Sequence, residues 1–224
     1  MEDVLEPYQE PYDPDAPVVC MDEASKQLVG ETRVPVPAAP GRPARVDYEY
    51  ERKGTANIFI FAEPLLGWRS TQVTEQRTRI DWALAVKELL DVHYPDVRVV
   101  RLVMDNLNTH SIGSLYEAFK PAEARRLSQR LEIHYTPKHG SWLNIAEIEL
   151  QVLSGQCLDR RIENRAELDC EVQAWTDERN TSIIGVDWQF TTKDARTRLK
   201  RLYPEFQALT AEQHGSATNI LSRP

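Results

Sequence analysis

Two aspartates in this chain directly follow apolar, β-branched runs that are typical of buried strands. Asp22 follows Val18–Met21, and Asp105 follows Val99–Met104. A carboxylate at such a place is costly unless it is paired, hydrogen-bonded or bound to a cation. A single aspartate of this kind most often starts a turn or caps a helix. Two of them, on strands that could lie side by side, favour a shared cation site, whereas Glu23 would point to the opposite face of a continuing strand.

A third carboxylate could reach this place from a helix. The segment 135–149 (YTPKHGSWLNIAEIE) reads as the end of a strand, a polar turn and the start of a helix, and it carries Glu147 and Glu149 in the early turns of that helix. Such an order would bring a carboxylate toward the strand ends. Helical periodicity does not choose between the two glutamates, so the residues alone leave both as candidates for the third acid.

Other polar residues near these acids are candidate substrate-binding residues. Asn106 and His110 follow the second aspartate and could orient either a metal ligand or the substrate. Lys138 and His139 precede the helix and could contact a phosphate, although a solvated polar turn explains them equally well. A zinc site is not expected, since no histidine pair has the i, i+4 spacing of a zinc enzyme and the three cysteines are widely separated.

The elements that would position these residues form a mixed α/β layout, with a three-stranded meander first and parallel strands afterward. The expected strands span 17–22, 45–50, 57–62, 68–74, 97–104 and 131–135, and the expected helices span 78–94, 114–130 with a break at Pro121, 142–158, 165–179 and 193–202. A turn is expected at Gly54. A doubly wound nucleotide-binding fold would need a glycine-rich phosphate loop, which follows none of these strands. We therefore predict an RNase H-like mixed sheet flanked by helices.

The charge of the chain is concentrated at its N-terminus. Residues 1–23 carry eight of the 35 acids and no Lys or Arg, so the remaining 27 acids match the 27 bases of the rest. Proteins that bind DNA by themselves usually have a basic face, so this balance argues against autonomous nucleic-acid binding. The absence of a long apolar run, the acidic start and the unpaired cysteines predict a cytoplasmic protein with no membrane partner.

Several long motifs resemble the catalytic core of DDE transposases, and in particular the bacterial insertion-sequence transposases of the mariner superfamily. They are VMDNLNTH (103–110), HYTPKHGSWLNIAE (134–147), VCMDEASKQL (19–28) and DWQFTTKDARTRLKRLYP (187–204). They occur in the order that the family has, and the resemblance covers roughly residues 17–204. A fold like that of retroviral integrases is implied.

This resemblance implies that Asp22, Asp105 and Glu147 are the three catalytic and metal-binding acids. Glu147 is chosen because 144–147 matches the family's Asn-x-x-Glu pattern; the 41 residues between Asp105 and Glu147 exceed the most familiar mariner spacing. Three carboxylates would hold two Mg²⁺ ions about 3.5–4 Å apart, with Mn²⁺ as a substitute. The implied reaction is cleavage of DNA by water and joining by a DNA 3′-hydroxyl at the ends of an insertion sequence, without a covalent protein intermediate.

The resemblance also predicts the organisation and the partners of the chain. Family members usually begin with a helix-turn-helix region of a hundred or more residues, whereas about 20 residues precede Asp22 here. We expect an acidic, proline-rich segment at 1–16, the catalytic domain at 17–180, and a helical extension with a tail at 181–224. The expected partners are transposon-end and target DNA, a separate or missing helix-turn-helix region, and a second copy in a homodimer. The alternatives are a catalytically silent remnant, a dimerisation module that acts only with a DNA-binding partner, and a nuclease indifferent to element ends.

Overall fold

The computed structural model of the protein describes residues 1–203 and divides the chain into two compact units. The first unit, Met1–Gln189, contains the sheet and its helices. The second begins at Phe190 and contains helix α7 (Thr192–Arg198), which a capping box between Thr191 and Asp194 starts, followed by the short helical turn η4 (Lys200–Leu202). The part of the predicted 181–224 extension from residue 204 onward lies outside the described residues.

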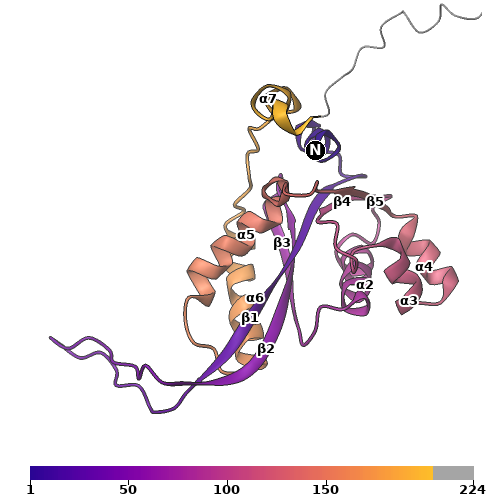
Figure 1. Cartoon of the computed structure of the whole chain (residues 1–224). Helices are drawn as coiled ribbons and strands as arrows, with labels where there is room; N and C mark the ends of the chain where they lie inside the picture. The colour runs from indigo at the N-terminus through magenta and orange to yellow at the C-terminus, as the bar shows by residue number, and fades with distance from the viewer. Residues whose placement is uncertain (204–224) are drawn as a thin grey trace, which may run out of the picture. The chain divides into compact units, whose positions relative to one another are not determined.

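Five strands form one mixed sheet in the order β3-β2-β1-β4-β5 (Figure 1). The first three pair antiparallel as a meander, and β4 and β5 are added parallel to β1. This is the predicted mixed sheet. The strands are β1 (Val18–Glu31), β2 (Tyr50–Glu63), β3 (Trp68–Thr74), β4 (Val100–Met104) and β5 (Leu131–Tyr135).

The β1–β2 hairpin is longer than predicted. Strand β1 does not end at Asp22, and it runs nine residues further because it pairs with β2 along its length. The separate strand expected at 45–50 is wrong, since β2 begins at Tyr50 and residue 45 makes only an isolated bridge to Val36. Cross-strand pairing thus extended both strands beyond their apolar runs, into a segment whose polar sequence gives no strand signal.

Gly54, predicted to lie in a turn, is inside β2. Its φ of 103° is in a region that glycine adopts without steric cost. The pairing with β1 shifts register between Leu28 and Val29, opposite this residue, so Gly54 marks a β-bulge that twists the hairpin. A glycine in the sequence cannot by itself distinguish a bulge from a turn.

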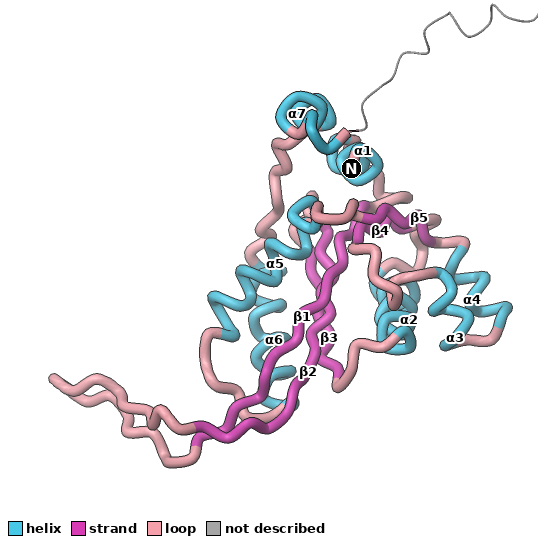
Figure 2. Tube along the Cα trace, in the orientation of Figure 1, coloured by secondary structure: helices cyan, strands magenta, loops and turns pink. Residues whose placement is uncertain are grey.

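Helices cover both faces of the sheet (Figure 2). On one face lie α2 (Arg79–Glu88), its π-helical continuation η1 (Leu89–His93), α3 (Ile112–Ala118) and α4 (Pro121–Ser128). On the other face lie α5 (Ile145–Leu153) and α6 (Arg165–Thr181). The helix predicted at 142–158 is three pieces, since a short turn η2 (Ser141–Leu143) precedes α5 and η3 (Ser154–Leu158) follows it. The predicted break at Pro121 is confirmed, because this proline starts α4.

Alternation along β1 separates the two faces of the sheet. Val19 and Met21 are fully buried in the core beneath α2, together with Phe59, Phe61 and Trp82. Residues at the even positions of β1 must therefore face the side that α5 covers. Asp22 belongs to the α5 side and Glu23 to the α2 side, as the sequence predicts for a continuing strand.

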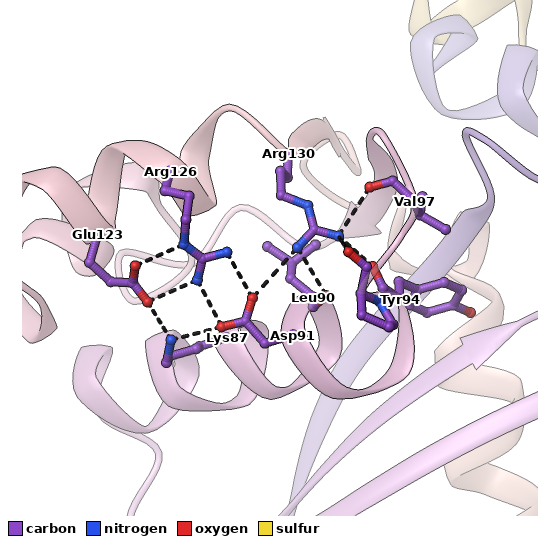
Figure 3. Close-up of polar contacts among 9 residues, drawn as sticks. Lys87, Leu90, Asp91, Tyr94, Val97, Glu123, Arg126 and Arg130 are labelled. Carbon is purple, nitrogen blue, oxygen red and sulfur yellow. Dashed lines mark hydrogen bonds and ion pairs between the residues drawn. The ribbon is translucent and has the colours of Figure 1, made fainter.

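A network of charges joins α2 to α4 and fixes the entry to β4 (Figure 3). Arg126 contacts Asp91 at 2.7–2.8 Å and Glu123 at 2.8 Å, while Lys87 contacts both acids.

Arg130 lies between η1 and β4, and its guanidinium donates hydrogen bonds to the carbonyls of Leu90, Tyr94, Pro95 and Val97. Leu90 lies in the last turn of the helix and Tyr94 follows it, where backbone carbonyls lack helical partners, so Arg130 stabilises the chain between η1 and β4.

The proline-rich segment 1–16 contains a short helix, α1 (Glu2–Gln9), that packs on the first unit. Val4 and Leu5 are fully buried, and the Tyr8 hydroxyl donates a hydrogen bond of 3.0 Å to the Leu143 carbonyl just before α5. Three of the N-terminal acids, Glu2, Asp3 and Glu6, therefore lie on a docked helix. Among the described residues, the longest helices are too short or too polar to cross a bilayer.

Candidate active site

Strands β1 and β4 carry the two predicted aspartates to neighbouring places. Their parallel register pairs Val18 with Arg101 and Cys20 with Val103. Continued for two more residues, the same register sets Asp22 beside Asp105, on strands about 4.7–4.9 Å apart. Asp22 lies within the longer strand, whereas Asp105 is the first residue after β4. The two acids thus meet at the carboxyl end of β4.

Asp22 is largely buried, and its neighbours include other carboxylates. Burial, together with the negative charges of Glu23, Asp105 and Glu147, raises the pKa of its carboxyl to about 7, against a hydrogen bond from the Glu23 backbone N–H at 2.8 Å. The pKa of a carboxyl rises when it is buried and when like charges lie near it. The structure therefore brings Asp22, Asp105 and Glu147 together, although they are far apart in the sequence.

Asn144 positions the helix that carries the third acid. Its side chain accepts a hydrogen bond from the Ala146 N–H, which caps α5, and it donates one of 2.8 Å to the Met21 carbonyl on β1. The first turn of α5 is therefore attached to the strand one residue before Asp22. Glu147 lies in this turn, with its N–H bonded to the Asn144 carbonyl. The Asn-x-x-Glu spacing thus has a physical reason, since the asparagine both caps the helix and fixes it at the site.

Glu149, the alternative third acid, is committed to a buried ion pair. Arg69 donates to both of its carboxylate oxygens at 2.6 and 2.7 Å, and Arg179 adds contacts of 3.0 and 3.1 Å. Burial opposes its ionisation, but the hydrogen bonds and charges of these arginines hold the pKa of Glu149 below its usual value. By contrast, the Oε2 atom of Glu147 is buried and has no hydrogen-bond partner in the described part of the chain. The contacts favour Glu147, a choice that periodicity leaves open.

Asp105 is held by a buried histidine. His110 Nδ1 lies 2.5 Å from Asp105 Oδ1, and its Nε2 lies 3.1 Å from Glu23 Oε2. The ligand atoms of these three residues lie within 4.8 Å of one another, a spacing that a metal ion could also produce. Although burial lowers it, the hydrogen bonds to Asp105 and Glu23 raise the pKa of His110 to about 9. One carboxylate faces each ring nitrogen, so we interpret the cluster as an ion-paired support of Asp105.

The sequence predicted no role in the site for Glu23, whereas the structure shows its carboxylate in contact with His110. Glu23 points to the α2 side, as expected, and its side chain is 2% exposed. The signal in the sequence was an acid at a strand position where alternation requires an apolar residue. This acid contacts His110 and thereby the second predicted acid.

The four predicted substrate-binding residues differ in exposure. Asn106, Lys138 and His139 are exposed, and the last two lie in the turn between β5 and α5, where His139 has a φ of 65°. His110 is 1% exposed. It cannot reach a DNA backbone from there, so of its two expected roles the contacts favour the orientation of a metal ligand.

Residues 17–169 match the family model for "DDE superfamily endonuclease". The chain belongs to the DDE superfamily of endonucleases. The sequence-based identification of a DDE catalytic domain is thereby confirmed. A search of curated proteins finds no match to this chain.

Solved transposase structures share the fold of this DDE endonuclease. The Mos1 transposase paired-end complex with the left transposon end has a TM-score of 0.53 at 15% identity. The Mos1 mariner paired end complex with Mn has 0.53 at 14%, and the Mos1 strand transfer complex has 0.52 at 14%. Each match covers 82% of this chain and 57% of the other, so the chain spans little more than half the length of these relatives. The predicted RNase H-like fold is confirmed.

The carboxylates of this DDE domain fit a divalent cation. Asp22, Asp105 and Glu147 offer hard oxygen ligands, which Mg²⁺ and Mn²⁺ prefer. The buried Glu147 Oε2 has no hydrogen-bond partner among the described residues, and burial and neighbouring negative charges raise the pKa of Asp22; such an ion would relieve both conditions.

We expect Asp22→Asn to stabilise the metal-free protein above about pH 7. The folded pKa of about 7 exceeds the unfolded value of about 3.9, so this group favours folding fully below pH 4 and loses that contribution as pH rises through 7. Asparagine does not titrate. In urea unfolding with EDTA, the variant should gain about 1–2 kcal/mol over the wild type between pH 5 and pH 8, after allowance for solvent screening. The exposed Asp169→Asn on α6 is the control, and an unchanged difference at both pH values would contradict the expectation.

Proposed function

We propose that the chain is the catalytic domain of an insertion-sequence transposase, which cleaves DNA at the element ends and joins the freed 3′-hydroxyl to target DNA. The observation that carries this proposal is the gathering of Asp22, Asp105 and Glu147 from two parallel strands and a capped helix. Membership of the DDE superfamily supports it. So does the shared fold with structures whose titles name a transposon end, Mn and strand transfer.

Asp22, Asp105 and Glu147 would hold two Mg²⁺ ions, for which Mn²⁺ would substitute. Such ions supply activation of the attacking oxygen and stabilisation of the leaving oxygen. The chain contributes the positions of the ligands. Asn144 holds the first turn of α5 against β1, and His110 fixes one oxygen of Asp105.

The exposed Asn106, Lys138 and His139 would contact the scissile phosphate or the flanking DNA. Because the chain beyond residue 23 has as many acids as bases, recognition of the ends would belong to a helix-turn-helix region, supplied separately or by another part of the protein. We place the catalytic domain at 17–180, between the docked segment 1–16 and the extension 181–224. It would act in the cytoplasm as a homodimer.

The test is a nicking and joining assay on the purified chain. A labelled duplex carrying the element ends is incubated with Mg²⁺ or EDTA, with and without a helix-turn-helix partner. We expect nicking at the ends with Mg²⁺, loss of nicking with EDTA, and loss of nicking in Asp105→Asn but not in Asp169→Asn. Silence under every condition would indicate a remnant or a dimerisation module, and cleavage indifferent to the ends would indicate a general nuclease.

A further inference from the structure

Glu23 is a buried acid on the apolar side of β1. Its side chain is 2% exposed, and its strand partner in β2 is the buried Phe59. Among the described residues its carboxylate contacts His110, at 3.1 Å, and the half-exposed Arg77, at 3.7 Å. A carboxylate in such surroundings lowers stability unless it is well paired. Its presence there therefore needs a reason other than the stability of the sheet.

The imidazole between Glu23 and Asp105 has little freedom to move. One ring nitrogen faces each acid, and the ring stacks near Trp82, with centroids 6.1 Å apart and planes at 29°. The backbone of His110 is also fixed, since its N–H donates to the Leu107 carbonyl and its carbonyl accepts a 2.9 Å hydrogen bond from the Tyr135 hydroxyl. A rotation of the ring would break contacts on both sides.

We propose that Glu23 and His110 are positioning residues for Asp105. Glu23 anchors the far side of the imidazole, the near side fixes Asp105 Oδ1, and Oδ2 is thereby presented to a metal ion on the α5 side. This inference rests on the proposed function, which makes Asp105 a metal ligand. Both ring nitrogens face carboxylates, at 2.5 Å from Asp105 and 3.1 Å from Glu23, so the imidazole is directed toward these two acids.

The experiment measures Mn²⁺ binding to the full chain by the electron paramagnetic resonance signal of free Mn²⁺, without DNA. We expect Glu23→Gln and His110→Ala to weaken Mn²⁺ binding by about 10- to 100-fold, the usual cost of losing a group that orients a metal ligand. His110→Asn should recover part of the loss, because its amide can donate near the position of Nδ1. The control is Glu63→Gln, which changes another buried glutamate, 3% exposed and hydrogen-bonded to Tyr94, and should bind Mn²⁺ as the wild type does.

Circular dichroism and thermal unfolding of each variant show that the measured chain is folded. If His110→Ala does not fold, the positioning role is tested with Glu23→Gln, which keeps the shape of the glutamate, and with His110→Asn. Wild-type binding in the Glu23 and His110 variants, with binding lost in Asp105→Asn, would overturn the positioning role and leave the proposed function standing. Binding abolished in Glu23→Gln as completely as in Asp105→Asn would make Glu23 a ligand and also overturn it. Wild-type binding in Asp105→Asn would overturn the proposed function, and this inference with it.

Discussion

Glu147→Gln is expected to lower the rate of Mg²⁺-dependent DNA nicking by about 10³-fold, because one ligand charge disappears where the metal contributes several kcal/mol to the transition state. The fold should be unaffected. Glutamine has nearly the same shape, and the buried Oε2 of Glu147 makes no hydrogen bond within the described residues that the change could break. The measurement is a single-turnover nicking rate on a pre-nicked or intact element end, with Mg²⁺ varied to saturation.

The matched control is Glu178→Gln, which changes an exposed glutamate on α6 and should retain the wild-type rate. In thermal unfolding, the free energy of unfolding of Glu178→Gln should agree with that of the wild type within about 0.5 kcal/mol. That of Glu147→Gln should be equal to the wild-type value within the same limit, or higher. A Glu147→Gln protein that nicks at the wild-type rate would place the third acid elsewhere.

Arg69→Met should lower the free energy of unfolding by about 3–5 kcal/mol, the usual cost of removing one partner of a buried ion pair. Arg69 and Glu149 are each 2% exposed, and the guanidinium also donates to the carbonyls of Gly67 and Ile184. The substitution leaves the Glu149 carboxylate buried beside Arg179 alone. Urea denaturation at neutral pH measures the change.

A double variant separates the charge from the packing. Arg69→Met combined with Glu149→Met replaces both partners by apolar side chains of similar length, so it should regain much of the lost stability. A loss below 1 kcal/mol in Arg69→Met would show that the pair is not the structural link between β3, α5 and α6 that its contacts indicate. The folded fraction of the double variant should still nick DNA, since Glu149 would have no part in the chemistry.

Much of the secondary structure was predictable from local signals. The helix at 78–94 begins at Thr78 with a capping box, Pro121 starts α4, and the segment LEIHY at 131–135 forms β5 with the predicted bounds. Each of these depends on a few neighbouring residues. The β1–β2 hairpin was not predictable in the same way, because its outer half is held by pairing between strands rather than by apolar residues.

The residues of the candidate site were also predictable only where the signal is local in the sequence. Asp22 and Asp105 were identifiable because an acid after an apolar run stands out in the sequence, and the choice of Glu147 came from a family motif. The roles of Glu149 and Glu23 were not identifiable, since their partners Arg69 and His110 lie 80 and 87 residues away in the chain. An ion pair between residues far apart in the chain produces no periodic pattern in the sequence from which it could be predicted.

The sequence by itself determined most of the strands and helices, the acids that could bind a cation, and the acidity of the first 23 residues, because each is a property of short segments. Only the tertiary structure showed that Glu149 of α5 is held in a buried ion pair and that Glu23 contacts the histidine beside Asp105. The physical reason is that a carboxylate's role depends on the cations and the amount of water around it, and distant parts of the chain supply both only after folding.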